Sequence, residues 1–332
     1  MPQSHRVKFI VVAVIISLIG MFGRSMASAA IDAASTNTLP DPYRAVENWA
    51  QLPTGMQWGQ VINVVPDARG DIWIFHRTDP AILEFDASGK LLKSFGAGTF
   101  VQAHGLTIDH DGNIWVTDAQ GKNGKGQQAF KFNPDGKVLM TLGKAGVAGK
   151  GADTFNGPSA VIVAPNGDIF IADGHGADTN ARIVKFSKDG KFIKEWGKKG
   201  SGPGEFDTPH SMAMDSKGRL FVADRGNNRI QIFDQDGKFI DQWKQFGRPS
   251  GIFISKNDTL YAVDSQSDDK VNPGVKRGIR VGSAKNGAVK AFIPDLSANP
   301  DIALAEGVSA DAEGDIYAAG VSSMGLHKFV KK

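Results

Sequence analysis

Two histidines and one glutamate recur at one position of an internal repeat, where together they would form a metal site. The chain has 332 residues, and one phrase occurs in it six times: a tight turn around Gly or Asp, then an apolar and aromatic strand. Eight residues before the turn residue of copies two, four and six stand His104, His210 and Glu306. The other copies have short or apolar residues there, namely Ile62, Ser159 and Ser250.

Two imidazoles and one carboxylate are the ligand set of a catalytic zinc ion, whose fourth position stays open for water or substrate. Iron, manganese and cobalt accept similar ligands, so the residue types leave the choice among these ions open. A single histidine in a β-protein is usually a surface or hydrogen-bonded residue, and we interpret His110 and His327 in this way. Ligands in alternating copies of one register rarely arise by chance, so we predict a metal site.

A second register, seven residues after the turn residue, carries Arg77 and Arg225 in copies one and four. The planar fork of arginine suits carboxylates, so two arginines at one opening predict an anionic substrate or product. The alternative for Arg225 is an ion pair with the adjacent Asp224. His175 follows the equivalent residue of copy three and would act as a general base, because its unperturbed pKa is near neutrality.

The elements that position these residues are predicted to be the blades of an all-β, six-bladed β-propeller. The copies are 40 to 56 residues apart, a spacing typical of propeller blades, and begin at Arg69, Asp111, Asn166, Lys217, Asn257 and Glu313. The first strand of each blade lines the channel and alternate blades lie about 120° apart, so the three ligands would converge. The last copy is too short for a fourth strand, and we expect residues 46–52 to supply it and close the ring.

The first 29 residues are predicted to be a secretory signal peptide. A basic start at Arg6 and Lys8 precedes a short apolar run, and Ala27-Ser28-Ala29 fits a cleavage site. An uncleaved membrane anchor is the alternative. We therefore expect an exported protein, periplasmic or secreted and free of a stable membrane anchor, in which residues 30–45 are a linker and residues 46–332 the propeller.

Composition excludes several classes of function. The chain has no cysteine, which rules out disulfides, thiolate ligands and a lipoprotein anchor. Its 38 basic and 35 acidic residues give a net charge of +3, and the three basic residues of the predicted signal account for all of it. No block of Lys or Arg argues for nucleic acid. The Gly-rich stretches 143–157 and 197–204 lack the Gly-Lys-Ser/Thr ending of a phosphate-binding loop.

Most of residues 58–320 resemble peptidyl-α-hydroxyglycine α-amidating lyases, and the repeat itself resembles NHL-type propellers. The most specific segments lie in the first four copies: Phe75-His-Arg77, Ala103-His-Gly-Leu-Thr-Ile-Asp109, Ala172-Asp-Gly174, Arg182-Ile-Val-Lys-Phe186, Thr208-Pro-His-Ser-Met-Ala213 and Val222-Ala-Asp-Arg225. The resemblance implies a six-bladed propeller with a central zinc bound by three histidines. It also implies the cleavage of a peptidyl-α-hydroxyglycine into a peptide amide and glyoxylate.

The resemblance extends to single site residues. It places His104 and His210 at two of the family's zinc positions, and Glu306 at the position of the third histidine. It matches Arg77 and Arg225 with two active-site arginines. His175 corresponds to the family's catalytic tyrosine, because both follow the Asp-Gly that ends the strand.

A second metal of the family is not expected in this chain. The family's structural calcium uses an Asp directly after the third histidine, and this chain has Gly307 there. We therefore doubt that calcium binds.

Three classes of function remain open from the sequence. The first is a metal-dependent lyase acting on a small or peptide substrate that carries a carboxylate. The second is a non-enzymatic propeller whose face binds a protein or glycan. The third is a lactonase or esterase of another propeller type. Such sites usually rely on calcium bound by carboxylates and Asn, and the channel positions here are richer in histidine.

Overall fold

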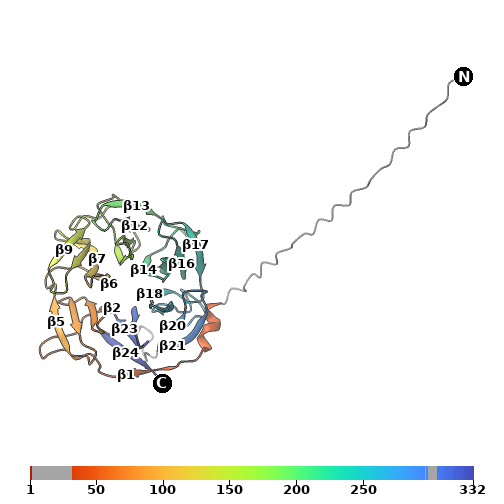
Figure 1. Ribbon diagram of the computed structural model, residues 1–332. Coiled ribbons are helices and arrows are strands. Elements are labelled where there is room, and N and C mark those ends of the chain that lie inside the picture. The colour runs from red at the N-terminus through yellow and green to blue at the C-terminus, as the bar shows by residue number, and fades with distance from the viewer. Residues whose placement is uncertain (2–31, 296, 298–304) are drawn as a thin grey trace. The chain divides into compact units, whose positions relative to one another are not determined.

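The computed structural model describes residues 1, 32–295, 297 and 305–332. The predicted signal peptide lies almost entirely outside these residues. In the described part of the chain, 24 strands form six four-stranded antiparallel sheets, arranged around a central axis (Figure 1). The predicted all-β, six-bladed propeller is confirmed. None of the helices within the described ranges has the length and apolar character needed to cross a membrane.

Each of the first five sheets uses four consecutive strands, and the sixth combines the two ends of the described chain. The first three sheets are β2 (Val61–Pro66), β3 (Ile72–His76), β4 (Ile82–Phe85), β5 (Leu91–Phe95); β6 (Ala103–Ile108), β7 (Ile114–Lys122), β8 (Lys125–Phe132), β9 (Val138–Leu142); and β10 (Pro158–Val163), β11 (Ile169–Asp173), β12 (Arg182–Phe186), β13 (Phe192–Trp196). The next two are β14 (Pro209–Met214), β15 (Leu220–Asp224), β16 (Arg229–Phe233), β17 (Phe239–Trp243); and β18 (Pro249–Ile254), β19 (Thr259–Asp264), β20 (Gly278–Ser283), β21 (Val289–Pro294). The sixth is β22 (Gly307–Ala310), β23 (Ile316–Gly320), β24 (Gly325–Lys331) and β1 (Tyr43–Val46). Two short 3₁₀ helices are η1 (Ala33–Thr38) and η2 (Arg225–Asn227).

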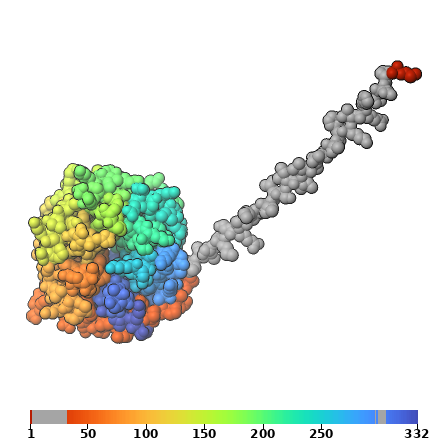
Figure 2. Space-filling view, in the orientation of Figure 1, coloured from red at the N-terminus to blue at the C-terminus, as the bar shows by residue number. Residues whose placement is uncertain are grey.

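The ring is closed by an N-terminal strand, but this strand lies earlier in the chain than predicted. The closing strand β1 pairs antiparallel with β24, from Tyr43 opposite Lys331 to Val46 opposite Lys328. Tyr43 is buried in the core cluster of the fifth and sixth sheets, whereas Trp49 of the expected strand packs against the first sheet. The space-filling view accordingly shows the orange first sheet directly beside the dark blue last sheet (Figure 2).

The interpretation of residues 30–45 as a linker is therefore wrong for much of that segment. Helix η1 and strand β1 both belong to the propeller. The Thr36 hydroxyl accepts a 2.7 Å hydrogen bond from Arg280 Nε, and the backbone N–H of Phe292 donates to Pro40 O at 3.1 Å. These polar contacts carry no hydrophobic pattern, which is why the sequence does not reveal them.

The hydrophobic core lies between neighbouring sheets. Strands β3 and β4 are buried along their whole length, while β5 alternates between partly buried and exposed residues. Trp115 of β7 packs with Val161 and Ile171 of the third sheet, which illustrates how adjacent blades interlock. A strand at the rim has one face in solvent, so it needs an alternating pattern, whereas inner strands do not. The inner ends of the blades are thus rigidly placed around the channel.

Candidate metal centre

The repeat position of His104 and His210 coincides with an irregularity in the first strand of each of their two sheets. The pairing of β6 with β7 shifts register across His104 and Gly105, and that of β14 with β15 shifts across His210. A bulged residue is left out of the ladder, and its side chain is aimed differently from those of its neighbours. Because the two rings come from different sheets and their centroids are 4.6 Å apart, both must point into the channel.

A third imidazole, that of His175, joins these two. Its ring centroid lies 4.3 Å from that of His104 and 5.1 Å from that of His210. One ring nitrogen from each of the three histidines lies within 4.8 Å of the others. From the sequence, His175 is predicted to be a general base; in the structure its ring lies with those of the predicted ligands His104 and His210.

The loop that follows β11 fixes the position of His175. The backbone N–H groups of Gly174 and His175 both donate to Gly157 O, each at 2.8 Å. A side chain at Gly157 would bring its Cβ to 2.7 Å from the backbone nitrogen of His175, and the φ of Gly157 is +88°. Only glycine accepts both the close approach and this backbone conformation.

Hydrogen bonds to the backbone set the tautomers of His104 and His210. His104 Nδ1 lies 2.6 Å from Ser159 O, and His210 Nδ1 lies 2.7 Å from Ser250 O. A carbonyl oxygen only accepts, so in each neutral imidazole Nδ1 carries the proton and Nε2 keeps its lone pair. Both Nε2 atoms are buried, and neither has a hydrogen-bond partner among the described residues. A metal ion would satisfy both lone pairs, and backbone carbonyls commonly orient metal-binding histidines in this way.

Glu306 lies at the edge of this cluster, between His210 and Arg225. It precedes β22, and its Oε1 is 3.3 Å from His210 Nε2 and 3.1 Å from Arg225 Nη1. In the tautomer given above, Nε2 of His210 has no proton to donate to the carboxylate. Two acceptors at 3.3 Å repel each other unless a proton or a cation lies between them. The geometry of Glu306 therefore also fits a cation at the three histidines.

The surroundings keep all three imidazoles neutral. Burial lowers the pKa of His104 and of His210 well below the usual value. Nearby positive charge lowers both pKa values further, and for His210 the largest such contribution is that of Arg225. The pKa of His175 falls to about 4, mainly through burial and then through Arg225. Metal binding requires neutral imidazoles, so no proton has to be removed from these ligands at neutral pH.

The two predicted arginines lie at the same centre. Arg225, the first residue of η2, donates to Glu306, while its buried Nε has no partner among the residues that the structure covers. Asp224 instead binds Arg229 at 2.8 Å, so the alternative pairing of Arg225 with Asp224 is not found. Burial lowers the pKa of Arg225, and the charge of Glu306 opposes this.

Arg77 directly follows β3, the second strand of the first sheet, and is held there by hydrogen bonds. Its Nε donates to Ala103 O at 3.1 Å and its Nη1 to Gln60 Oε1 at 2.8 Å. Its charge acts on His104, His175 and His210, whose pKa values it helps to lower. Two guanidinium groups therefore flank the histidine cluster, as an anionic ligand would require.

A third arginine, Arg248, was missed by the sequence reasoning. Its Nη1 donates to Arg225 O at 2.8 Å and to Asn228 Oδ1 at 3.0 Å. It stands two residues before Ser250 and thus belongs to neither register of the repeat. No signal in this single sequence distinguishes it from a surface arginine.

Comparisons with known proteins agree with the fold and with the predicted resemblance. The family model of the NHL repeat matches residues 206–233, and a family model described as a 6-bladed beta-propeller matches residues 155–219. The chain is 38% identical over 202 residues to peptidyl-glycine alpha-amidating monooxygenase of Mus musculus, covering 51% of this chain and 20% of that protein. It is 33% identical over 235 residues to peptidyl-alpha-hydroxyglycine alpha-amidating lyase 2 of Drosophila melanogaster, covering 61% and 53%.

The aligned region thus spans between a fifth and about half of the length of these two relatives. Among solved structures, a gluconolactonase from Xanthomonas campestris superposes with a TM-score of 0.60 at 17% identity, covering 88% of this chain and 96% of that one. At this identity the likeness shows the propeller fold alone. The chain is therefore an NHL-type six-bladed propeller with relatives named amidating lyases.

Proposed function

We propose that this protein is a metal-dependent lyase that cleaves the carbon–nitrogen bond of an α-hydroxy-amide, of the peptidyl-α-hydroxyglycine type, to an amide and glyoxylate. One observation carries the proposal. Two buried imidazoles present unpartnered Nε2 lone pairs to a third imidazole at the centre of the ring. The arginines beside them suit the substrate's carboxylate, and relatives at 33–38% identity are named for amidating activities.

We assign the metal, most simply zinc, to His104, His175 and His210. Each of these histidines offers one ring nitrogen within 4.8 Å of the other two, so the three neutral imidazoles would hold the ion together. When bound, the metal supplies Lewis acidity that lowers the pKa of the substrate hydroxyl. This assignment exchanges the roles given to His175 and Glu306 from the sequence, because Glu306 is engaged by Arg225 at 3.1 Å.

The residues of the chain then divide the remaining work. Arg77 and Arg225 bind the carboxylate of α-hydroxyglycine and orient it. Glu306 accepts the hydroxyl proton, the carbon–oxygen bond becomes the carbonyl of glyoxylate, and the carbon–nitrogen bond breaks. The amide nitrogen leaves carrying one hydrogen and needs a second to become a primary amide. Glu306 returns the proton that it accepted, so the reaction consumes no water.

The test combines metal analysis with turnover of a synthetic substrate. The purified protein should contain one zinc per chain and should release glyoxylate from N-acetyl-α-hydroxyglycine. His210→Ala should lose both the metal and the activity. His110→Ala is the matched control, because His110 is exposed and lies outside the cluster, and it should change neither.

Two outcomes would decide against the enzyme. Glyoxylate release by metal-free His210→Ala protein would refute the metal-dependent mechanism. A folded wild-type protein without metal and without turnover would support a propeller that binds a protein or glycan partner.

A further inference from the structure

Ser159 stands at the same repeat position as His104 and His210, in the third sheet, which packs between the second and the fourth. It is only 1% exposed, and no step of the reaction proposed above uses it. The pairing of β10 with β11 shifts register between Pro158 and Ala160, so Ser159, like the two histidines, lies outside the regular ladder. Such a residue can direct its carbonyl and its side chain away from its own sheet, and Ser159 contacts both neighbouring sheets.

Towards the second sheet, the backbone of Ser159 holds the ring of His104. Ser159 O accepts a hydrogen bond from His104 Nδ1 at 2.6 Å. This approach depends on Gly105, because a Cβ there would lie 2.8 Å from both Ser159 O and Ala160 Cα. A side chain at position 105 would therefore push the two strands apart and weaken the hydrogen bond.

Towards the fourth sheet, the hydroxyl of Ser159 holds the peptide unit that carries His210. Ser159 Oγ lies 2.6 Å from Pro209 O and 3.3 Å from Ala172 O. A hydroxyl has a single proton, so Oγ donates it along the shorter contact, to Pro209 O. Pro209 O belongs to the planar peptide unit that ends at the Cα of His210. The hydrogen bond therefore fixes the backbone from which the His210 side chain starts.

The equivalent peptide unit before His104 is held in the same way. Arg77 Nε donates at 3.1 Å to Ala103 O, the carbonyl directly before this histidine. Each histidine is thus held at two points: a side chain from the preceding sheet binds the carbonyl before it, and a carbonyl of the following sheet accepts its Nδ1 proton. Of these four contacts Ser159 supplies two, one to each histidine, so it links the positions of His104 and His210.

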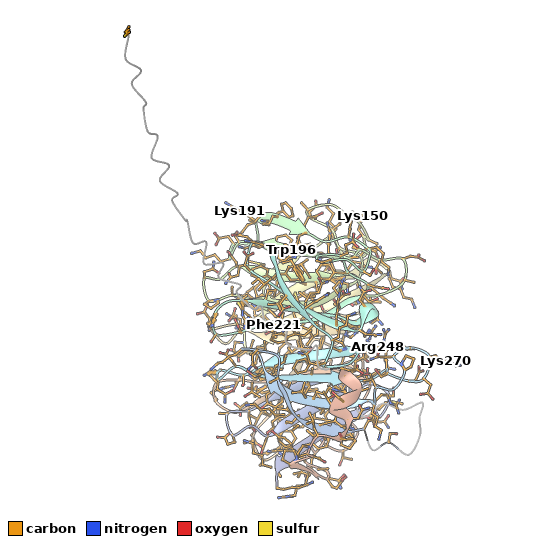
Figure 3. All side chains as sticks on the ribbon, turned by 90° about the vertical axis from the view of Figure 1, so that its right-hand side faces the viewer. Lys150, Lys191, Trp196, Phe221, Arg248 and Lys270 are labelled. Atoms are coloured by element: carbon orange, nitrogen blue, oxygen red, sulfur yellow. The ribbon has the colours of Figure 1, made fainter. Side chains whose placement is uncertain are left out.

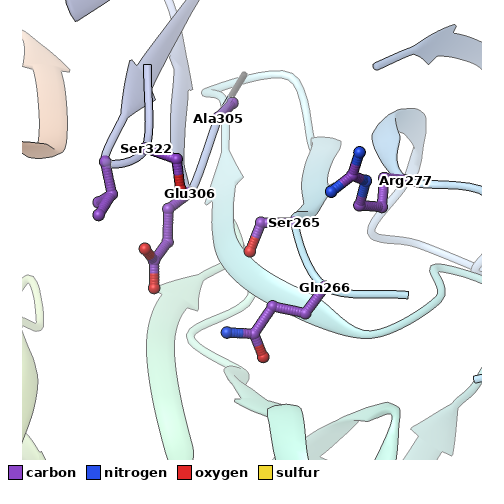
Figure 4. Close-up of a pocket in the computed structure, with 7 residues that line it drawn as sticks. Ser265, Gln266, Arg277, Ala305, Glu306 and Ser322 are labelled. Carbon is purple, nitrogen blue, oxygen red and sulfur yellow. The ribbon is translucent and has the colours of Figure 1, made fainter. Parts of the chain in front are cut away.

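Ser250, the equivalent serine of the fifth sheet, provides a comparison. Ser250 O accepts from His210 Nδ1 at 2.7 Å, as Ser159 O does from His104. Its hydroxyl, however, pairs with Ser265 Oγ at 2.6 Å, and Ser265 directly follows β19 of the same sheet. This second hydroxyl pair is also close to the centre, since Ser265 and Glu306 line one pocket (Figure 4).

The arginines proposed to bind the carboxylate are held by other contacts. Arg248 Nη1 donates to Arg225 O at 2.8 Å, which joins the loop before β18 to the fourth sheet. Figure 3 shows Arg248 on the right-hand side of the molecule together with Lys270. Arg77 is held by Gln60 Oε1 and Ala103 O. Loss of the Ser159 hydroxyl therefore leaves these contacts of Arg77 and Arg225 in place.

We propose that Ser159 is a positioning residue that sets the distance between the two metal-binding imidazoles. The inference rests on the proposed function, because it takes His104 and His210 as ligands of the metal. The carbonyl of Ser159 fixes the ring of the first and its hydroxyl fixes the backbone of the second, so the two unpartnered Nε2 lone pairs converge before the metal arrives. A site formed in advance loses less freedom on binding, so its affinity for the metal is higher.

Ser159→Ala and Ser265→Ala form a matched pair that tests this inference. Each removes one buried hydroxyl with a 2.6 Å hydrogen bond and leaves every backbone carbonyl in place. Binding of cobalt(II), whose visible absorption reports on the geometry of its ligands, should be about tenfold weaker in Ser159→Ala than in the wild type, and the absorption spectrum should change. Ser265→Ala should keep the affinity and the spectrum of the wild type. Urea unfolding of the metal-free proteins should show a similar loss of stability for both variants.

Kinetics at saturating zinc provide a second measurement. Ser159→Ala should lower kcat for N-acetyl-α-hydroxyglycine and leave KM unchanged, because the contacts that hold Arg77 and Arg225 remain. Wild-type protein that binds neither zinc nor cobalt would overturn the proposed function and this inference with it. Tight binding by the wild type that Ser159→Ala leaves unchanged would overturn the inference alone, and so would an equal weakening in Ser265→Ala.

Discussion

Separate replacement of His175 and Glu306 tests which of the two binds the metal. His175→Ala removes an imidazole whose nitrogen lies within 4.8 Å of the other two ligand nitrogens. Glu306→Gln keeps the size of the side chain and an oxygen that accepts from Arg225, but removes the charge 3.3 Å from His210 Nε2. If His175 is a ligand and Glu306 its neighbour, the first change must weaken metal binding far more than the second.

The expected difference follows from the number of ligands. Zinc binding in four-ligand protein sites amounts to roughly 10–16 kcal/mol at pH 7, so one ligand contributes about 3 kcal/mol on average. Loss of His175 should therefore raise the metal dissociation constant by more than about a hundredfold. A neighbour that only contacts a ligand typically changes metal affinity about tenfold to a hundredfold, and Glu306→Gln belongs at the lower end because its contact with Arg225 survives.

Competition with chelators of graded strength, followed by elemental analysis, measures both effects. The wild type and His110→Ala should retain zinc against the same chelator. Glu306→Gln should release it to a slightly stronger competitor, and His175→Ala to a much weaker one. If Glu306→Gln lost its metal while His175→Ala retained it, the assignment would be refuted, and the set His104, His210 and Glu306 predicted from the sequence would stand instead.

Three further predictions concern the surroundings of the site. Burial lowers the pKa of His175 from 6.5 to about 4, so this residue alone should cost the metal-free protein roughly 3 kcal/mol of stability as the pH falls from 6.5 to 4, where the unfolded chain binds the proton and the folded chain does not. The lowered pKa values of His104 and His210 add to this loss. Urea unfolding across this range measures it, and a flat profile would contradict it. Arg225→Lys should raise KM for N-acetyl-α-hydroxyglycine about tenfold or more, because an ammonium group cannot form the bidentate pair, and equal KM values would argue against carboxylate binding there. Asn37→Ala should lower the free energy of unfolding by about 2 kcal/mol, because it removes three hydrogen bonds. Asn286→Ala, in an exposed turn, is the control. If Asn37→Ala destabilises the protein no more than the control does, residues 33–38 behave as a linker after all.

The repeat explains how much of the fold and site is predictable from one sequence. Equivalent positions of a ring lie at equivalent distances from its axis, so the spacing to the turn glycine is enough to place His104 and His210 near each other. The same argument places Arg77 and Arg225 at the mouth. For the two histidines, the argument holds because the register shift that aims their side chains occurs in the first strand of both of their sheets.

The parts that the sequence did not reveal depend on single contacts rather than on the repeat. His175 reaches the cluster because a carbonyl of Gly157 holds the start of its loop, and no periodicity encodes that contact. Arg248 acts through hydrogen bonds to Arg225 O and Gln266, both far from it in the chain. The closing strand β1 begins at Tyr43, whose ring is buried in the hydrophobic core of the fifth and sixth sheets. This contact depends on tertiary packing and not on the repeat.

The two departures from the pattern of the amidating lyases both lie beside His210, and we infer that they compensate each other. By resemblance, the family has tyrosine where this chain has His175 and histidine where it has Glu306, so the number of imidazoles at the centre stays at three. His175→Tyr alone should weaken metal binding, and Glu306→His alone should keep the metal but lose the proton acceptor. The double variant should regain the metal and release glyoxylate at least about tenfold faster than the product of the two single effects predicts, since residues in one network are not additive. Strict additivity of the two changes in kcat/KM, in variants shown to be folded, would mean that the positions act independently and that the exchange of roles between His175 and Glu306 is wrong.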